Sequence, residues 1–225
     1  MDKPKGRHEL KHYINYIDVI ELGKRLPFVA SLDKNGTEEN GYRVRSLYFD
    51  NYNDKALKKK VDGVNEREKF RLRFYNDNTS FIRLEKKSKK NGICFKESAV
   101  VTEEQCISII AGDFAVLKEG NNPLCMELYA KMHYQHLRPK NIVDYWREAY
   151  VYPPGNVRIT LDYNIRTSYN THIFLNPEPV PIPIPDTFIL EVKYDEFLPE
   201  IIRGLVSLSS RRSSAFSKYA VTRII

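Results

Sequence analysis

The sequence predicts an α+β fold in which an antiparallel sheet of about eight strands forms a closed or nearly closed β-tunnel with flanking helices. Two observations carry this prediction. Segments with alternating polar and apolar residues follow one another through short turns, as in an antiparallel meander. In several of these segments, basic side chains occupy the face opposite the apolar one. The apolar faces are therefore expected to pack against helices, and the charged faces to line the interior.

The composition is that of a globular chain without a membrane span. Of the 225 residues, 42% are hydrophobic and 29% are charged, which allows one sizeable core. No run approaches the roughly 18 apolar residues of a membrane helix, and the N-terminus lacks the apolar stretch of a secretory signal. We therefore expect a single domain over residues 1–225 in the cytoplasm, with association with a membrane partner left open. The three cysteines lack CxxC spacing, which favours buried or half-buried thiols over a disulfide framework or a zinc site.

The N-terminal part predicts two strands and two helices. Residues 7–11 alternate so that their three charged side chains share one face of a strand. Asp18 is the expected N-cap of a helix with an apolar stripe, which Pro27 is expected to end or kink. Residues 42–49 alternate again and run into a turn, and the lysine-rich residues 55–60 are expected to form a short solvated helix.

A hairpin with one cationic face is the most distinctive pattern. In its first strand, basic side chains alternate with aromatic and leucine side chains, the basic ones being Arg67, Lys69, Arg71 and Arg73. The second strand repeats this alternation, with one face formed by Phe81, Arg83, Glu85 and Lys87. A third strand, residues 92–101, carries Lys96 in a similar alternation. Solvated strand faces usually mix Thr, Ser, Glu, Lys and Gln, so the dominance of Arg and Lys indicates an anion-binding surface.

The second half of the chain predicts further helices and strands around a proline-rich segment. Helices are expected at residues 103–110, 124–137 and 199–208, and strands at residues 141–152, 157–165 and 188–194. Prolines at every second position from Pro177 to Pro185 require an extended backbone and exclude a central strand, so we expect a connector at the rim. Arg158, Thr160 and Asp162 share one strand face, as do Glu191 and Lys193.

The net charge of +7 indicates an acidic partner, and the position of the cations narrows its class. Two like charges about 6 Å apart at an effective dielectric constant of about 20 repel by roughly 3 kcal/mol. Several such pairs inside a tunnel call for anions, and a chain of phosphates fits a tunnel better than a compact ligand does. Aromatic side chains fall mainly on the apolar strand faces, so no stacking platform for nucleic acid is expected.

Short motifs along nearly the whole chain carry a family resemblance. The Arg-x-Glu-x-Lys pattern of residues 7–11 resembles the opening strand of the triphosphate tunnel metalloenzymes, also called the CYTH-like superfamily. Within them, the chain resembles the vacuolar transporter chaperone (VTC) domain, the polyphosphate polymerase branch. The matching pieces occur in the order of that family: YRVRSLYFD (42–50), KFRLRFY (69–75), LEKK (84–87), RPKNIVDYWREAY (138–150), VRITLD (157–162), LEVK (190–193) and FSKY (216–219).

The resemblance implies an activity and a set of site residues. The activity would be transfer of the γ-phosphoryl group of ATP to a growing polyphosphate chain, assisted by Mn²⁺ or Mg²⁺. ATP and inorganic polyphosphate or triphosphate would be its partners. The basic phosphate-binding positions match Lys11, Arg71, Arg73, Lys87, Lys96, Arg147, Arg158 and Lys218. The expected cofactor-binding residues among them are Arg71, Arg73, Arg147 and Arg158. Glu191 matches the metal-binding glutamate, whereas Glu9 and Glu85 are weaker metal candidates because each could instead pair with neighbouring cations.

The chemistry of phosphoryl transfer agrees with this residue set. The reaction needs positioning and charge neutralisation more than covalent help from the protein. Arginine offers a planar fork to phosphate, lysine a point charge, and a carboxylate suits a hard cation. No dedicated general base is expected, because the attacking group would already be an anionic phosphate oxygen.

One departure from the family pattern keeps alternatives open. The C-terminal motif of the family reads Lys-Phe-Ser-Lys, and its first position here is Ala215. One basic residue is therefore missing, which Arg211 or Arg212 would have to replace. The alternatives are a tunnel triphosphatase that hydrolyses tripolyphosphate or nucleoside triphosphates, and a non-catalytic module that binds polyphosphate.

Overall fold

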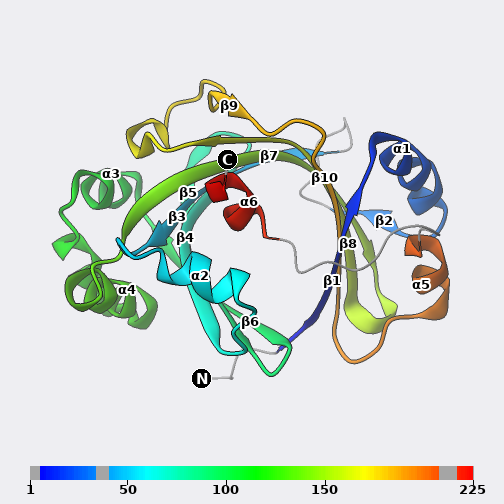
Figure 1. The fold of residues 1–225 in the computed structure, drawn as a ribbon, viewed down its shortest axis with the longest axis horizontal. Coiled ribbons are helices and arrows are strands. Elements are labelled where there is room, and N and C mark those ends of the chain that lie inside the picture. Colours follow the sequence, from blue (N-terminus) through cyan, green and yellow to red (C-terminus); the bar gives the residue numbers. More distant parts are fainter. Residues whose placement is uncertain (1–5, 34–40, 208–216, 225) are drawn as a thin grey trace.

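The computed structural model describes residues 6–33, 41–207 and 217–224, which form one curled antiparallel sheet with helices around it (Figure 1). Its main strands lie in the order β1-β10-β8-β7-β3-β4-β5-β6. They are β1 His8–Ile14, β3 Tyr42–Asp50, β4 Arg67–Tyr75, β5 Asn78–Lys90, β6 Ile93–Val101, β7 Arg138–Tyr152, β8 Val157–Ser168 and β10 Phe188–Tyr194. Two short strands are added at the sides: β2 Ser31–Leu32 pairs with β7, and β9 Ile182–Pro183 pairs with β8.

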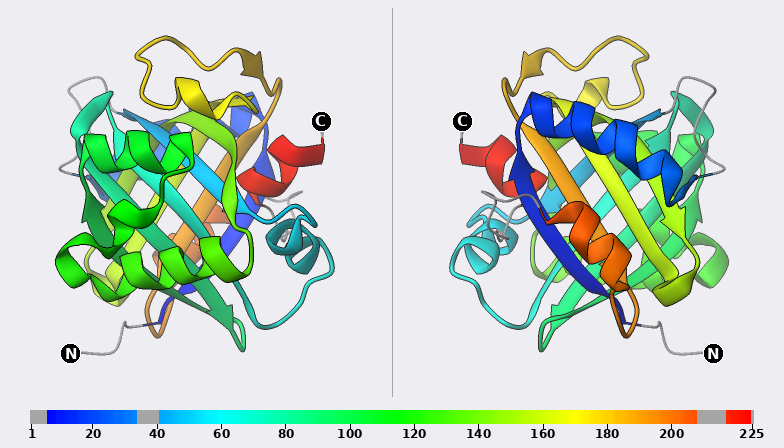
Figure 2. Two further views of the ribbon diagram at one scale, coloured as in Figure 1. Left: turned by 90° about the vertical axis from the view of Figure 1, so that its left-hand side faces the viewer. Right: turned by 90° about the vertical axis from the view of Figure 1, so that its right-hand side faces the viewer.

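The two ends of this strand order, β1 and β6, meet and bring the sheet round into a tunnel. The backbones of Arg7 and Cys94 exchange hydrogen bonds of 3.0 and 3.1 Å between these ends. The strands cross the molecule at a tilt, as a curled sheet requires (Figure 2). The predicted α+β fold with an antiparallel β-tunnel is confirmed.

Helices cover the outside of the sheet in two groups. The helices are α1 Tyr16–Arg25, α2 Lys55–Val61, α3 Glu103–Ala111, α4 Pro123–Tyr134, α5 Glu200–Val206 and α6 Lys218–Ile224. Short 3₁₀ segments occur at Leu26–Phe28, Ala115–Asn121, Pro154–Asn156 and Thr171–Ile173, and the second is interrupted by a kink at Glu119 and Gly120. Helices α3 and α4 lie on one side of the tunnel and α1 and α5 on the opposite side, with α2 and α6 between them (Figure 1). In the part of the chain that the structure describes, no helix is long and apolar enough to cross a membrane.

The apolar strand faces form two outer cores, as the alternation predicts. Phe70, Leu72 and Leu84 pack with Leu128 and Met132 of α4. On the opposite wall, α1 and α5 pack their apolar side chains onto β8 and β10 in a second cluster. Because side chains alternate along each strand, this packing turns the charged side chains inward. The three thiols are free, with Cys94 half-buried and Cys106 and Cys125 buried.

Some expected boundaries were wrong, each for a local reason. The N-cap of α1 is Asn15 and not Asp18, because the two form a reciprocal capping box in which each side chain accepts the other's backbone N–H at 2.8 Å. Strand β7 begins at Arg138 and not at residue 141, because a shift in register opposite Phe49 accommodates Pro139. Helix α6 was not expected at all.

The remaining expectations hold with small changes at the ends. Helices α4 and α5 end at Tyr134 and Val206, each earlier than expected. The proline-rich segment lies at the side of the sheet, where only Ile182–Pro183 pairs with a strand, so the connector prediction is confirmed.

Candidate functional site

A cavity of about 640 Å³ occupies the interior of the tunnel. Six of the predicted phosphate-binding cations line it: Arg71, Arg73, Lys87, Lys96, Arg147 and Arg158. Lys11 lines a narrower section of about 130 Å³, which shares Glu9, Lys87 and Cys94 with the main cavity. We call the main cavity the tunnel centre. The fold thus brings together cations that lie far apart in the sequence.

The β4–β5 hairpin sets the register of three of these cations, Arg71, Arg73 and Lys87, and the pairing of β5 with β6 adds Lys96. Asn76 and Asp77 form its turn with φ angles of 50° and 56°, a left-handed conformation that Asn and Asp tolerate well. The pairing then places Arg71 opposite Glu85, and Lys87 between Lys69 and Lys96. Paired residues share a face of the sheet, so all of these charges point inward.

Glu85 joins three of the cations in the tunnel centre. Its carboxylate lies 2.6 Å from Arg71 Nη2, 2.5 Å from Lys96 Nζ and 3.9 Å from Arg73 Nη1. Burial alone would raise the pKa of Glu85, but Arg71 and Arg73 outweigh burial and hold the pKa far below its usual range. Glu85 is therefore ionised and engaged with cations, which is the alternative role that the sequence left open for it.

Asp162 forms a second junction, which the sequence prediction of site residues missed. Arg147 donates to its carboxylate from Nε and Nη2 at 2.6 and 2.7 Å, and Lys218 contacts the same carboxylate from α6. Burial raises the pKa of Asp162, but Arg147 and Lys218 lower it below its usual value. The signal was present, because Asp162 alternates on one strand face with Arg158.

Glu9 and Glu191 lie on the neighbouring strands β1 and β10, with Lys11 between them. Lys11 Nζ lies 3.7 Å from Glu9 and 3.3 Å from Glu191. Lys87 Nζ lies 2.5 Å from Glu9, whereas the other cations near Glu191, Lys193 and Arg147, are 3.6 and 3.7 Å away. Burial raises the pKa of Glu9, but Lys87 and Lys11 lower it to about 2, so this carboxylate is ionised.

The donor set allows a test of whether a divalent cation fits here. Among the described residues, no group of three or more His, Cys, Asp or Glu side chains is arranged to hold a metal ion alone. Mg²⁺ in phosphate-handling sites is typically held by one or two carboxylates together with phosphate oxygens. Glu191 fits that arrangement, since the cations around it stand off at 3.3 Å or more. Glu9 lies on the neighbouring strand, but Lys87 contacts its carboxylate at 2.5 Å, so it fits less well. Glu85 fits less well, because Arg71 and Lys96 contact it closely.

Tyrosine hydroxyls hold three of the arginines, a feature that sequence reasoning missed by treating aromatic residues as core. Arg71 donates to Tyr48 at 3.0 Å, Arg73 to Tyr145 at 3.1 Å, and Arg158 to Tyr42 at 2.8 Å. Arg158 also lies 2.6 Å from Asp33. These contacts restrict the guanidinium groups before any ligand binds, which lowers the entropic cost of binding an anion there.

Two inward lysines outside the predicted set have strongly lowered pKa values. Burial lowers the pKa of Lys69 to about 7 together with Lys87 and Lys11, against a raising effect of Tyr48. Burial likewise lowers the pKa of Lys193 to about 7, although Glu191 raises it. The charge of the tunnel therefore changes near neutral pH. The position of the missing lysine, Ala215, lies outside the described residues. The two arginines that would have to replace its charge, Arg211 and Arg212, lie outside them too.

Comparison with solved structures shows the fold at low sequence identity. A candidate adenylate cyclase from Bacillus halodurans superposes with a TM-score of 0.54 at 14% identity, covering 91% of both chains. The PH1819 protein of Pyrococcus horikoshii has a TM-score of 0.51 at 14% identity, covering 97% of this chain and 98% of the other. The PH1012 protein of the same organism has a TM-score of 0.50 at 13% identity, covering 94% and 96%.

Sequence comparison identifies the family. No curated protein matches the chain in a direct search. The profile of the VTC domain, however, matches residues 6–224, which is nearly the whole chain. The curled sheet, its inward cations and this match agree with one another. The protein belongs to the VTC domain family.

Proposed function

We propose that the protein is a metal-dependent polyphosphate polymerase, which transfers the γ-phosphoryl group of ATP to a growing polyphosphate chain inside the tunnel. The observation that carries the proposal is the convergence of cations from β1, β4, β5, β6, β7 and β8 on one connected interior space. Lys218 of α6 is joined to one of them, Arg147, through Asp162. Membership of the VTC domain family supports the same substrate class.

The side chains present suit the charge changes of this reaction. A terminal phosphate oxygen of the chain attacks the γ-phosphorus, the bond to the β,γ-bridging oxygen breaks, and ADP leaves with the electron pair. The nucleophile is already anionic, so no proton has to be removed. Arg71, Arg73, Arg147 and Arg158 would hold the triphosphate, and the lysines would neutralise charge along the chain.

A divalent cation, Mn²⁺ or Mg²⁺, completes the proposal. Glu191, together with Glu9, would hold it at the side of the tunnel where β1 and β10 meet. When bound, it would neutralise charge on the phosphate oxygens as a Lewis acid. Lys11 bridges these two carboxylates and would have to release at least one of them. For Glu9 to reach the metal, Lys87, which lies 2.5 Å from its carboxylate, would have to move as well.

Ala215 favours a second candidate, because the family motif has lysine at that position. A tunnel that lacks one cation would still bind triphosphate, and would either pass the phosphoryl group to water or bind without turnover. The two enzyme activities share the same cations and differ in the acceptor.

Incubation of the purified protein with ATP and Mn²⁺ tests the proposal. We expect a ladder of long product on a gel stained for polyphosphate, together with ADP. Free phosphate without polymer would overturn the polymerase in favour of the triphosphatase. Neither product, with tripolyphosphate binding retained in calorimetry, would leave a binding module.

A further inference from the structure

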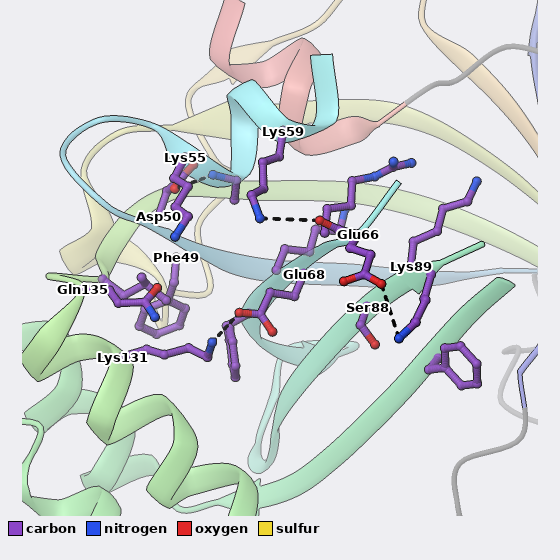
Figure 3. A pocket seen from close by; sticks show the side chains of 17 residues that line it. Phe49, Asp50, Lys55, Lys59, Glu66, Glu68, Ser88, Lys89, Lys131 and Gln135 are labelled. Atoms are coloured by element: carbon purple, nitrogen blue, oxygen red, sulfur yellow. Dashed lines mark hydrogen bonds and ion pairs between the residues drawn. The ribbon is translucent and has the colours of Figure 1, made fainter. Parts of the chain in front are cut away.

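A second cavity, of about 360 Å³, lies at the rim of the tunnel between α2, the start of β4, the end of β5 and α4 (Figure 3). We call it the rim groove. It is continuous with the narrow section of the tunnel, because both are lined by Ala56, Arg67, Glu68, Lys69, Ser88 and Lys89. The narrow section in turn shares residues with the tunnel centre. One path therefore leads from the interior over the rim to the outer surface.

The rim groove and the narrow section carry positive charge that the protein does not compensate. Their basic residues without a carboxylate within ion-pair distance, within the described part of the chain, are Lys55, Lys59, Lys60, Arg67, Lys69 and Lys89. The acidic residues of the groove have other partners. Glu66 pairs with Lys90 at 3.3 Å, and Glu68 pairs with Lys131. Asp50 accepts backbone N–H groups of Ala56 and Leu57 at the start of α2.

The crowding of these cations has a measurable consequence. Burial, together with the neighbouring Arg67 and Lys11, lowers the pKa of Lys60 to about 8. A lysine whose neighbours disfavour its charged form gains from an anion placed among them. The groove is also fixed in place, because the Tyr219 hydroxyl donates to Asp50 at 2.7 Å and so ties α6 to the start of α2.

We infer that the rim groove holds the part of a linear phosphate chain that extends beyond the tunnel. This inference rests on the proposed function and adds a surface site to it. Charges repeated along a flexible line suit lysines spaced along a groove, which bind as point charges. A nucleic acid is disfavoured because two of the three phenylalanines that line the groove, Phe49 and Phe70, are each 1% exposed. Only the half-buried Phe95 is left, and a single ring does not form the series of stacking faces that successive bases require.

Paired variants on α2 test the inference. Lys55 and Lys59 point into the rim groove from one face of the helix (Figure 3), whereas Lys58 is exposed and does not line it. The test variant is Lys55→Ala/Lys59→Ala. The matched control is Lys58→Ala/Lys24→Ala, which removes the same charge at exposed helix positions outside the groove. Binding of tripolyphosphate and of long-chain polyphosphate is measured for both at several salt concentrations.

The expected result separates the two ligands. Loss of two phosphate contacts should weaken long-chain binding roughly thirtyfold and make the negative slope of log K against log salt less steep by about 1.4 units. Binding of tripolyphosphate, which the tunnel centre can hold alone, should match that of the control. Equal long-chain affinity in the test and control variants would overturn the groove while leaving the tunnel intact. An equal drop in affinity for tripolyphosphate and for long-chain polyphosphate in the test variant would also overturn the groove. If the wild type bound neither ligand, the proposed function would be overturned as well.

Discussion

The tunnel centre and the rim groove are both rich in cations, but they differ in how many of these cations have a carboxylate within ion-pair distance. Each of the eight cations predicted to bind phosphate lies within 4 Å of a carboxylate, on Glu9, Asp33, Glu85, Asp162 or Glu191. In the rim groove and narrow section, six basic residues have no such partner among the described residues. The contrast is one of degree, since Arg83 lines the tunnel centre without a carboxylate partner among the described residues, and Lys90 and Lys131 of the rim groove have one. Most cations of the centre are compensated, and most of those at the rim are not.

The difference teaches what each region can do. In the tunnel centre, carboxylates hold the cations in fixed positions and offset their mutual repulsion. An entering phosphate therefore takes the place of a carboxylate as the partner of a cation. Such a site selects by geometry, and salt screens it little because it is buried. The rim groove lies at the surface and attracts anions over a longer range, at a strength that falls with ionic strength. Specificity is therefore expected in the centre and capture at the rim.

The largest expected effect comes from breaking compensation in the tunnel centre. Glu85→Gln keeps the shape of a side chain that is 1% exposed and removes its charge, which leaves Arg71, Arg73 and Lys96 facing one another. Removing one partner of a buried ion pair typically costs about 3–5 kcal/mol. We expect the free energy of unfolding in urea to fall by that amount.

Two comparisons make the Glu85→Gln result specific. Glu66→Gln removes an exposed carboxylate of the rim groove, whose ion pair with Lys90 should contribute less than about 1 kcal/mol. Tripolyphosphate should raise the melting temperature of Glu85→Gln more than that of the wild type, because it replaces the lost negative charge. A stability of Glu85→Gln equal to that of Glu66→Gln would show that the centre needs no internal compensation.

A smaller effect is expected at the carboxylate with the loosest ion pairs. The cations around Glu191 stand 3.3 to 3.7 Å away, compared with 2.5 Å between Glu85 and Lys96. Glu191→Gln should therefore cost less stability than Glu85→Gln. If Glu191 holds the metal, the variant should raise the Mn²⁺ concentration for half-maximal ATP turnover about tenfold or more.

The metal assignment has a readout apart from turnover. Mn²⁺ binding in the presence of tripolyphosphate can be followed by electron paramagnetic resonance of the free ion. Glu85→Gln serves as the control that should leave the Mn²⁺ midpoint nearly unchanged. An unchanged midpoint in Glu191→Gln, with a shifted one in Glu85→Gln, would move the metal site to the other side of the tunnel.

The fold could be predicted from the sequence, but most of the difference between the tunnel centre and the rim groove could not. Alternation in residues 67–75 and 78–90 predicts which side chains point inward, because that depends only on local strand geometry. The pairing of Lys87 with Glu9 joins residues 78 positions apart and depends on β6 meeting β1. The sequence therefore predicted the cations and left ion pairing open for Glu9 and Glu85, but it did not predict which cation each would contact, and it missed Asp162.

The rim groove was harder still to predict. Residues 55–60 were correctly expected to form a short helix, but a lysine-rich helix alone indicates only a solvated surface. What makes α2 a wall of the groove is its packing against β3, β4 and α6, and α6 was not expected. The role of tyrosines as partners of arginine depends in the same way on distant strands, since Arg73 and Tyr145 lie 72 positions apart.

The smallest expected effect concerns Lys69, which lines both the rim groove and the narrow section. Burial and the neighbouring Lys87 and Lys11 lower its pKa from 10.5 to about 7, so Lys69 is charged below pH 7 and largely neutral at pH 8. A bound phosphate favours the charged form, and binding at pH 8 should therefore take up about one proton at this site. Tyr48 acts in the same direction, because burial raises its pKa but Arg71 and Lys69 lower it to about 6. Affinity for long-chain polyphosphate should accordingly fall as pH rises from 6 to 8, and Lys69→Met should flatten that fall whereas Lys58→Met should not. Calorimetry in two buffers of different ionisation enthalpy measures the proton uptake. Equal uptake by the wild type and by Lys69→Met would contradict the prediction. It would mean that a neighbouring group keeps Lys69 charged at pH 8, as carboxylates do for cations of the tunnel centre.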